Sequence, residues 1–374
     1  GLVGSEMCIR DSCPMSNKDA QSKLEAEEQL KQVRLQALAR TYEQADRVIT
    51  GDPIRVHLAP SGPAPAWSDG KSVTFNMAEI EEFDIEELVQ LNGLNYHELS
   101  HLEYTPRKSS KLVEWVLENN LMAAFNMLED QRIETLLTGR FPSVVPYLQA
   151  TIARWLANTP QDVSLNYVCI RGRRYLPLKV REMFRDSFID QSLVPVIAKI
   201  VDEYRLLAFP DDADRGMELI KEFEDKVLSK MPRNPTDGGP GKCANRPPVA
   251  AGRPAKGKRQ RIDARRSSRS SLPEDKTDQI EEVTEADVTV DQDQALEARN
   301  EAVKRFELKP GESSERKAGL GHVESTGGVP EDFNKVLERT IEDAMSRKDV
   351  QADVKARQRC LLYTSPSPRD QRGS

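Results

Sequence analysis

The composition of the chain changes sharply after Met231, and this change limits how much of the sequence can form a packed core. Residues 232–330 are first rich in proline, glycine, serine and basic side chains, and then in acidic ones. Such segments bury too little apolar surface to offset the entropy lost on folding. We therefore expect a disordered linker over 232–330 and a folded region before it.

Both ends of the chain resemble translated sequencing adapter. Residues 7–11 can be encoded by ATGTGTATAAGAGACA, whose reverse complement TGTCTCTTATACACAT encodes residues 360–364, so one DNA segment read on opposite strands accounts for both ends. We expect residues 1–14 and 360–374 to be adapter artefact, which is set aside in reasoning about the fold. The expected native start is Met15, and the native C-terminus is expected to lie beyond about Arg359.

Charge and hydropathy argue against several classes of protein. The formal net charge of -7 and the pI near 5.5 do not suit a general nucleic-acid or membrane-surface binder, because both need a dominant basic face. The basic segment 256–271 has no interleaved aromatic residues, which favours a solvated tether over a specific nucleic-acid site. No apolar run is long enough to span a membrane, and we expect a cytoplasmic protein.

Cysteine usage supports neither a disulfide framework nor a cysteine zinc site. Outside the two ends that resemble adapter, only Cys169 and Cys243 remain. They lie far apart in the sequence and have no paired spacing.

Apolar periodicity predicts an α+β fold that is predominantly helical. Residues 15–50 predict an N-terminal helix that Gly51 can stop, and residues 51–231 predict the main domain. Within it, 54–58 and 72–76 are strand-like and predict a small sheet. Residues 331–359 have helical spacing and predict the start of a further, truncated C-terminal element.

Helix boundaries in the main domain can be placed from capping signals. Asp84 followed by Glu87 is a capping-box pattern, so a helix should begin near Ile85 and continue through Tyr104 to the break at Pro106. A second helix is predicted over 110–138, ended by Gly139. Further helices are predicted over 143–157, 177–187, 190–207 and 213–230.

The hexapeptide YHELSH, Tyr96–His101, holds half of the four histidines of the chain. On a helix, His97 and His101 project from one face, so both imidazoles can reach a zinc ion at roughly 2.0–2.1 Å. Glu98 lies next in angle around the helix, where it can accept a proton from a metal-activated water. This spacing predicts a Zn²⁺ site with Glu98 as the catalytic base.

The third ligand is expected from the next helix, in the segment NMLEDQRIE, residues 126–134. Glu129 and Asp130 each interrupt an otherwise apolar helical line, and a buried carboxylate needs a compensating charge such as a metal. We prefer Asp130 and keep Glu129 as the alternative. Glu134 lies one turn after Asp130 and can orient a ligating histidine, and Asn126 is a second supporting residue.

HELSH, the LEDQRIE segment and the preceding PAWSDGKSVTFN together resemble zincin metallopeptidases, over about residues 50–230. More narrowly, they resemble metallopeptidase domains of phage and bacterial proteins that also carry a von Willebrand A-like domain, including relatives of the cobaltochelatase large accessory subunit. The resemblance implies that His97 and His101 bind the metal, that Glu98 is the catalytic glutamate, and that the Glu129–Asp130 pair supplies the remaining ligand. It also implies that a linker precedes a von Willebrand A-like domain.

Two functions follow as expectations. The first is a zinc-dependent metallopeptidase acting on a peptide or protein substrate. The second is a non-catalytic or structural-metal interaction module that partners a MoxR-type AAA+ ATPase. Neither predicts a specific nucleic-acid or membrane partner, and the sequence names no cleavage specificity, oligomeric state or choice between phage and bacterial origin.

Overall fold

The computed structural model describes residues 17–62, 64–77, 80, 82–158, 163–231, 292–305 and 331–363. The predictions for residues 1–14, for 364–374 and for most of the expected linker lie outside these ranges.

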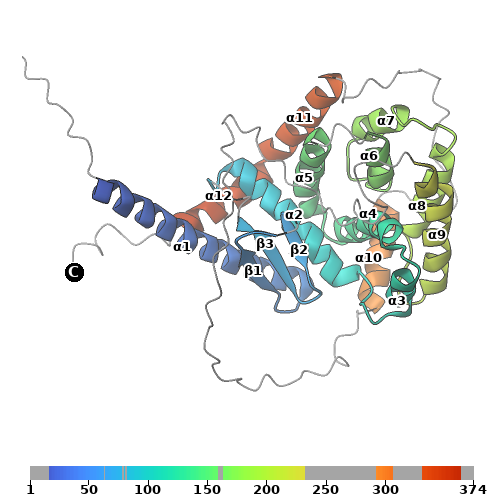
Figure 1. Cartoon of the computed structure of the whole chain (residues 1–374), viewed down its shortest axis with the longest axis horizontal. Coiled ribbons are helices and arrows are strands. Elements are labelled where there is room, and N and C mark those ends of the chain that lie inside the picture. Colours follow the sequence, from blue (N-terminus) through green and yellow to red (C-terminus); the bar gives the residue numbers. More distant parts are fainter. Residues whose placement is uncertain are drawn as a thin grey trace, which may run out of the picture.

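The expected α+β fold with mostly helical content is confirmed (Figure 1). The elements are α1 (Asn17–Thr50), β1 (Arg55–Ala59), β2 (Ala66–Ser68), β3 (Ser72–Asn76), α2 (Ile85–Tyr104), α3 (Lys111–Glu118), α4 (Met122–Arg140), α5 (Val145–Asn158), α6 (Val163–Ile170), α7 (Leu178–Asp186), α8 (Val194–Tyr204), α9 (Ala213–Lys226), α10 (Gln292–Arg305), α11 (Glu331–Ser346) and α12 (Lys348–Tyr363), with short 3-10 helices η2 (Pro142–Val144) and η4 (Leu228–Lys230). No helix of the described residues is long and apolar enough to cross a membrane.

The sheet has the order β1-β3-β2 and packs between α1 and α2 (Figure 1). β1 pairs parallel to β3, with Arg55 opposite Ser72, and β2 pairs antiparallel to β3, with Ala66 opposite Phe75. The strands β1 and β3 were predicted, whereas β2 lies in the expected loop. Three residues are too short to show an alternating pattern, so pairing with β3 decides that this segment is a strand.

α2 begins and ends where its capping signals place it. The Asp84 carboxylate accepts a hydrogen bond from the Glu87 amide at 2.8 Å, and the Glu87 carboxylate accepts one from the Phe83 amide at 2.6 Å. These bonds satisfy amides that have no partner inside the helix. The helix stops at Thr105, just before Pro106. Its packing against α4 and α5 sets the position of the two histidines.

The single helix predicted over 110–138 is wrong, because the chain breaks into α3 and α4 at Asn119–Leu121. Asn120 has a φ of 57°, the left-handed conformation that asparagine tolerates better than most residues. A pair of asparagines is also a weak helix-forming sequence. The break lets α4 take its own direction, and α4 carries the acidic residues of the candidate site.

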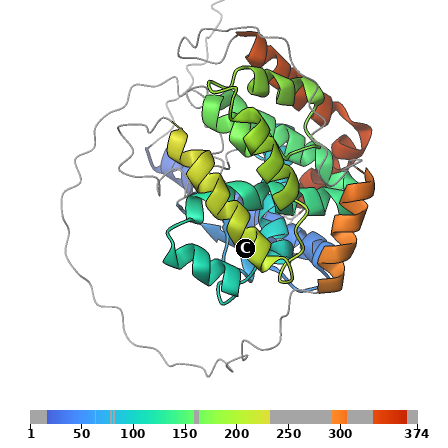
Figure 2. The ribbon, with the colours of Figure 1, turned by 90° about the vertical axis from the view of Figure 1, so that its right-hand side faces the viewer.

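Gly139 does not end α4, which continues to Arg140. A Cβ at this position would lie 2.8 Å from the Cβ of Ala302 on α10, so glycine serves the close approach of the two helices. The expectation that residues 232–330 are entirely without structure is therefore wrong for 292–305. α10 packs against α4 (Figures 1 and 2). Ala298 and Ala302 of α10 are completely buried.

Residues 331–359 do not begin a separate element, contrary to expectation. α11 packs against α5 and α7, and α12 packs against α1 and α2, so both belong to the same body (Figure 1). α12 continues through 360–363, where Leu361 is buried in the cluster around the sheet. The helix α6 was also missed, since its sequence is mostly apolar and shows no helical period.

Asp46 on α1 is fully buried against Asn95 of α2, which donates a hydrogen bond to it at 2.6 Å. Its second carboxylate oxygen has no hydrogen-bond partner among the residues that the structure describes. Burial raises the pKa of Asp46 from 3.8 to about 7, against the Asn95 bond and the charge of Arg357. The folded state thus binds this proton more tightly than the unfolded state. Protonated Asp46 contributes fully to the free energy of unfolding below pH 4, and this contribution is lost as the pH rises through 7.

We therefore expect Asp46→Asn, which stays neutral, to raise the free energy of unfolding at pH 8 by roughly 2–4 kcal/mol and to change it little at pH 4. Urea denaturation at both pH values measures the difference. Asp343→Asn, at an exposed position on α11, is the control. Equal effects of Asp46→Asn at the two pH values would contradict the assignment.

Candidate metal centre

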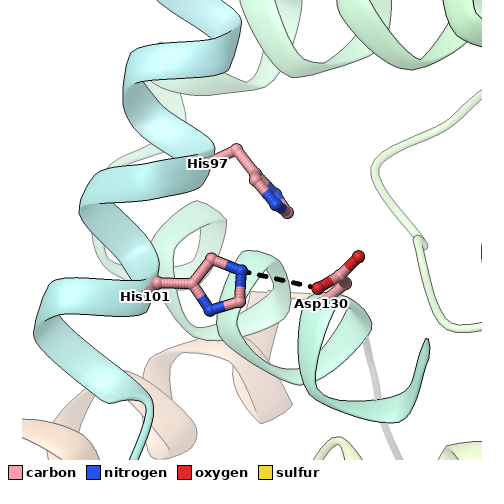
Figure 3. A group of neighbouring side chains, drawn as sticks. All are labelled: His97, His101 and Asp130. Carbon is pink, nitrogen blue, oxygen red and sulfur yellow. Dashed lines mark ion pairs between the residues drawn. The ribbon is translucent and has the colours of Figure 1, made fainter. Parts of the chain in front are cut away.

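His97 and His101 project from the same face of α2 toward α4 (Figure 3). Their ring centroids are 4.9 Å apart and the rings are perpendicular. The His97 side chain is 7% exposed and the His101 side chain 24%, so the pair reaches from the interior toward solvent.

The Nδ1 atom of each histidine is held by another residue. His97 Nδ1 lies 2.8 Å from a carboxylate oxygen of Glu134, and His101 Nδ1 lies 3.0 Å from the hydroxyl of Thr105. A carboxylate accepts only, so in the neutral imidazole His97 Nδ1–H donates to Glu134 and Nε2 keeps its lone pair. This arrangement is typical of metal-ligating histidines, and it places Glu134 against His97, where its expected supporting role stays a prediction.

Asp130 on α4 is the carboxylate that meets the two histidines (Figure 3). His101 Nε2 lies 3.5 Å from its Oδ1, and one ligand atom from each of the three residues lies within 4.8 Å of the others. Tetrahedral bonds of 2.0–2.1 Å place two zinc ligands about 3.3 Å apart. His101 Nε2 and the Asp130 oxygen already have about this spacing. The two ligand atoms that lie farthest apart in the group would have to approach each other by about 1.5 Å or less. The two imidazoles and the carboxylate therefore fit a zinc ion held by three protein ligands.

Glu129 does not join this group. Its carboxylate is fully buried on another side of α4 and accepts hydrogen bonds from Arg132 at 2.7 and 2.9 Å and from the Tyr204 hydroxyl at 3.2 Å. Arg132 in turn donates to the backbone oxygens of Tyr104 and Leu207. The expectation of Glu129 as an alternative ligand is therefore not supported, because its charge is balanced by Arg132.

Arg173 and Tyr175 complete the site, and no sequence pattern pointed to them. Both lie in the turn between α6 and α7. Arg173 donates to both oxygens of Glu134, at 2.5 and 3.0 Å, and the Tyr175 hydroxyl donates to Glu134 at 2.6 Å. Arg173 also lies 3.7 Å from Asp130. The only signal was the charge-dense RGRR within an otherwise apolar stretch, which does not reveal a partner.

The pKa values of the acidic residues in the site follow from the charged groups around them. Burial alone would raise the pKa of Glu134, but the charge of Arg173 and the bond with His97 hold it well below its usual range. The pKa of Asp130 is also lowered, because its interactions with the two histidines and Arg173 outweigh burial. Both groups are therefore anionic at neutral pH.

His97 has the opposite shift. Burial lowers its pKa, but the hydrogen bond to Glu134 and the charges of Asp130, Glu134 and Glu98 outweigh this and raise it to about 9. The excess of negative charge thus attracts a cation to this place, and a proton competes with a metal for it.

Glu98 and Asn126 stand apart from the group of three. Glu98 is 5% exposed and lies close enough for its charge to act on His97. Asn126 is half-buried one turn before Asp130. The roles expected for them, proton acceptor and supporting residue, stay predictions.

No protein-family model, curated protein or solved structure matches this chain. The resemblance to zincin metallopeptidases and von Willebrand A-linked domains therefore stays a prediction. The function is argued from the geometry of the site.

Proposed function

We propose that this protein is a zinc-dependent hydrolase that cleaves peptide bonds. One observation carries the proposal: His97, His101 and Asp130 converge from two helices, while Glu134 and Thr105 hold the Nδ1 atoms of the histidines. A structural zinc site usually has four protein ligands, whereas a catalytic one has three and an open position. The choice of a peptide as substrate rests on the resemblance of HELSH and LEDQRIE to zincins.

The residues of the site would have three roles: binding the ion, orienting a histidine and transferring a proton. His97 Nε2, His101 Nε2 and an Asp130 oxygen would hold the ion, which when bound supplies the Lewis acidity that makes water nucleophilic near neutral pH. Glu134 keeps His97 in the tautomer that leaves Nε2 free. The Glu98 carboxylate would accept the proton of the attacking water and return it to the leaving amine.

Glu98→Gln tests the assigned base. We expect this variant to keep stoichiometric zinc, because Glu98 is not a ligand, and to lose about 10²–10⁴-fold in the rate of hydrolysis. Zinc content is measured by mass spectrometry of the purified full chain, and hydrolysis with fluorescently labelled casein and a mixed peptide library.

The matched control is Glu114→Gln, an exposed glutamate on α3, which should leave zinc content and rate unchanged. A Glu98→Gln variant as active as the parent would show that another group accepts the proton.

A second candidate function is a non-catalytic or structural-metal interaction module that acts with a MoxR-type AAA+ ATPase. The observation that favours it is Arg173, which already pairs with Glu134 and Asp130 and so balances part of the negative charge without a metal. Stoichiometric zinc in a wild-type chain that hydrolyses none of the peptide library would select this function over the first.

A further inference from the structure

A groove lies between α3 and α9, which pack against each other (Figure 1). Its volume is about 950 Å³, at the upper end of the roughly 300–1,000 Å³ that is typical of ligand sites. The residues that line this α3–α9 groove are Ser109, Lys111, Glu114, Trp115, Glu118, Asp214, Met217, Glu218 and Lys221. None of them belongs to the metal centre.

Each of the two helices presents one stripe of side chains to the groove. The lining positions on α3 are 111, 114, 115 and 118, and those on α9 are 214, 217, 218 and 221. Both sets have the i, i+3, i+4, i+7 spacing that places residues on one face of a helix. Trp115 and Met217 are half-buried and pack against the main core, so they form an apolar floor between exposed, charged side chains.

The charged side chains around this floor are mostly acidic, with four carboxylates against two lysines. Lys111 pairs with Asp214 at 2.6 Å, so these two charges balance each other. Lys221 and Glu218 each pair at 2.6 Å with a residue of α9 that does not line the groove. The lining residues therefore carry an excess of two negative charges.

Glu114 and Glu118 supply this excess. They lie one helical turn apart with Trp115 between them, and their exposed carboxylates have no ion-pair or hydrogen-bond partner among the described residues. Like charges at this spacing repel each other, so a cation beside them would be stabilised. The indole ring adds to this attraction, because the face of a tryptophan binds cationic groups.

The ligand that suits this surface is a segment with several arginine side chains. A guanidinium group can donate paired hydrogen bonds to a carboxylate and can also stack on an aromatic ring. Its aliphatic stem can cover apolar surface such as Met217 while the charged end stays at the carboxylates. A single metal ion or a small anion would make no use of the apolar floor.

The chain itself contains a segment of this chemistry. Residues 256–271, KGKRQRIDARRSSRSS, include seven lysine and arginine residues and one aspartate, and they lie outside the described residues. The 24 residues 232–255 connect the segment to the end of the part that contains α9. An extended chain covers about 3.3 Å per residue, whereas α9 is only about 21 Å long, so this connection is long enough for the segment to reach the groove.

We propose that the α3–α9 groove binds the chain's own basic segment, residues 256–271. Arginine side chains of the segment pair with Glu114 and Glu118 and lie against Trp115. Because the segment and the groove belong to one chain, the binding is intramolecular and is favoured by a high effective concentration. The proposal depends neither on zinc nor on hydrolysis.

Titration calorimetry with a synthetic peptide of residues 256–271 tests the groove. The protein is the full chain in which the seven lysine and arginine residues of the segment are replaced by glutamine, which leaves the groove free. We expect saturable binding that weakens about tenfold or more when Glu114→Gln and Glu118→Gln are combined, because charge-assisted hydrogen bonds are lost. The matched control combines Glu338→Gln and Glu342→Gln, two exposed glutamates one turn apart on α11, and should weaken binding less than about twofold.

The wild-type chain gives a second readout, because its own segment competes with the peptide. We expect the peptide to bind the wild type at least about tenfold more weakly than the chain with the neutral segment. Sedimentation velocity distinguishes the chain's own segment from that of a second copy, and the wild type should be a monomer. The proposal is overturned if the peptide binds both chains equally, if the α11 control weakens binding as much as the groove variant does, or if the wild type is a dimer that dissociates when its segment is neutral.

Discussion

Asp130→Ala is expected to weaken Zn²⁺ binding by about 100-fold or more while leaving the fold intact. Residues that only orient a ligand are worth about 10–100-fold in metal affinity, so a ligand itself should be worth at least as much. The Asp130 side chain is 28% exposed, and Arg173 keeps its bonds to Glu134, so the substitution buries no unpaired charge. Competition with a chromophoric chelator measures the affinity, and thermal unfolding checks the fold.

Histidine variants provide the matched controls for this measurement. His101→Ala should weaken zinc binding as much as Asp130→Ala does, whereas His57→Ala, an exposed histidine on β1, should not change it. An Asp130→Ala protein that binds zinc as tightly as the wild type would remove Asp130 from the ligand set and would leave the proposed function without its third ligand.

Glu129→Ala is expected to lower the free energy of unfolding by about 3–5 kcal/mol, because it leaves the guanidinium of Arg132 buried without a counter-charge. Among the described residues, Arg132 would keep the backbone oxygens of Tyr104 and Leu207 and the ring of Phe209, none of which carries a negative charge, and the Tyr204 hydroxyl would lose its acceptor. Chemical denaturation of the metal-free protein measures the loss.

The double variant Glu129→Met with Arg132→Met is the control for a buried ion pair. Replacing both charges removes the unpaired group, so we expect the double variant to lose less stability than Glu129→Ala alone. If Glu129→Ala unfolds at the same denaturant concentration as the wild type, the pair does not stabilise the fold as argued.

The two neighbouring acids are thus expected to differ in kind. Loss of Asp130 should affect the metal and spare stability, and loss of Glu129 should do the reverse. Their order in the sequence could not separate them, because both interrupt apolar lines of the same helix. Residues one apart project about 100° from each other around a helix, so the rotation of α4 against α2 decides which acid meets the histidines.

That rotation depends on contacts that are distant in the sequence. Arg132 reaches the backbone at Leu207, 75 residues further on, and Glu134 meets Arg173, 39 residues further on. No local pattern encodes these distances, since each depends on the packing of several helices at once. The packing of α10 against α4 at Gly139 was missed for the same reason.

What the sequence by itself determined is local. The capping box at Asp84, the stop at Pro106 and the helical spacing of His97 and His101 are set by hydrogen bonds and side-chain directions within a few residues, so the motif helix could be placed correctly. The tertiary structure alone decided which carboxylate approaches the histidines and which arginine balances it. These are interactions between charged side chains on separate helices, and only the packing of the helices brings such groups within a few ångströms of each other.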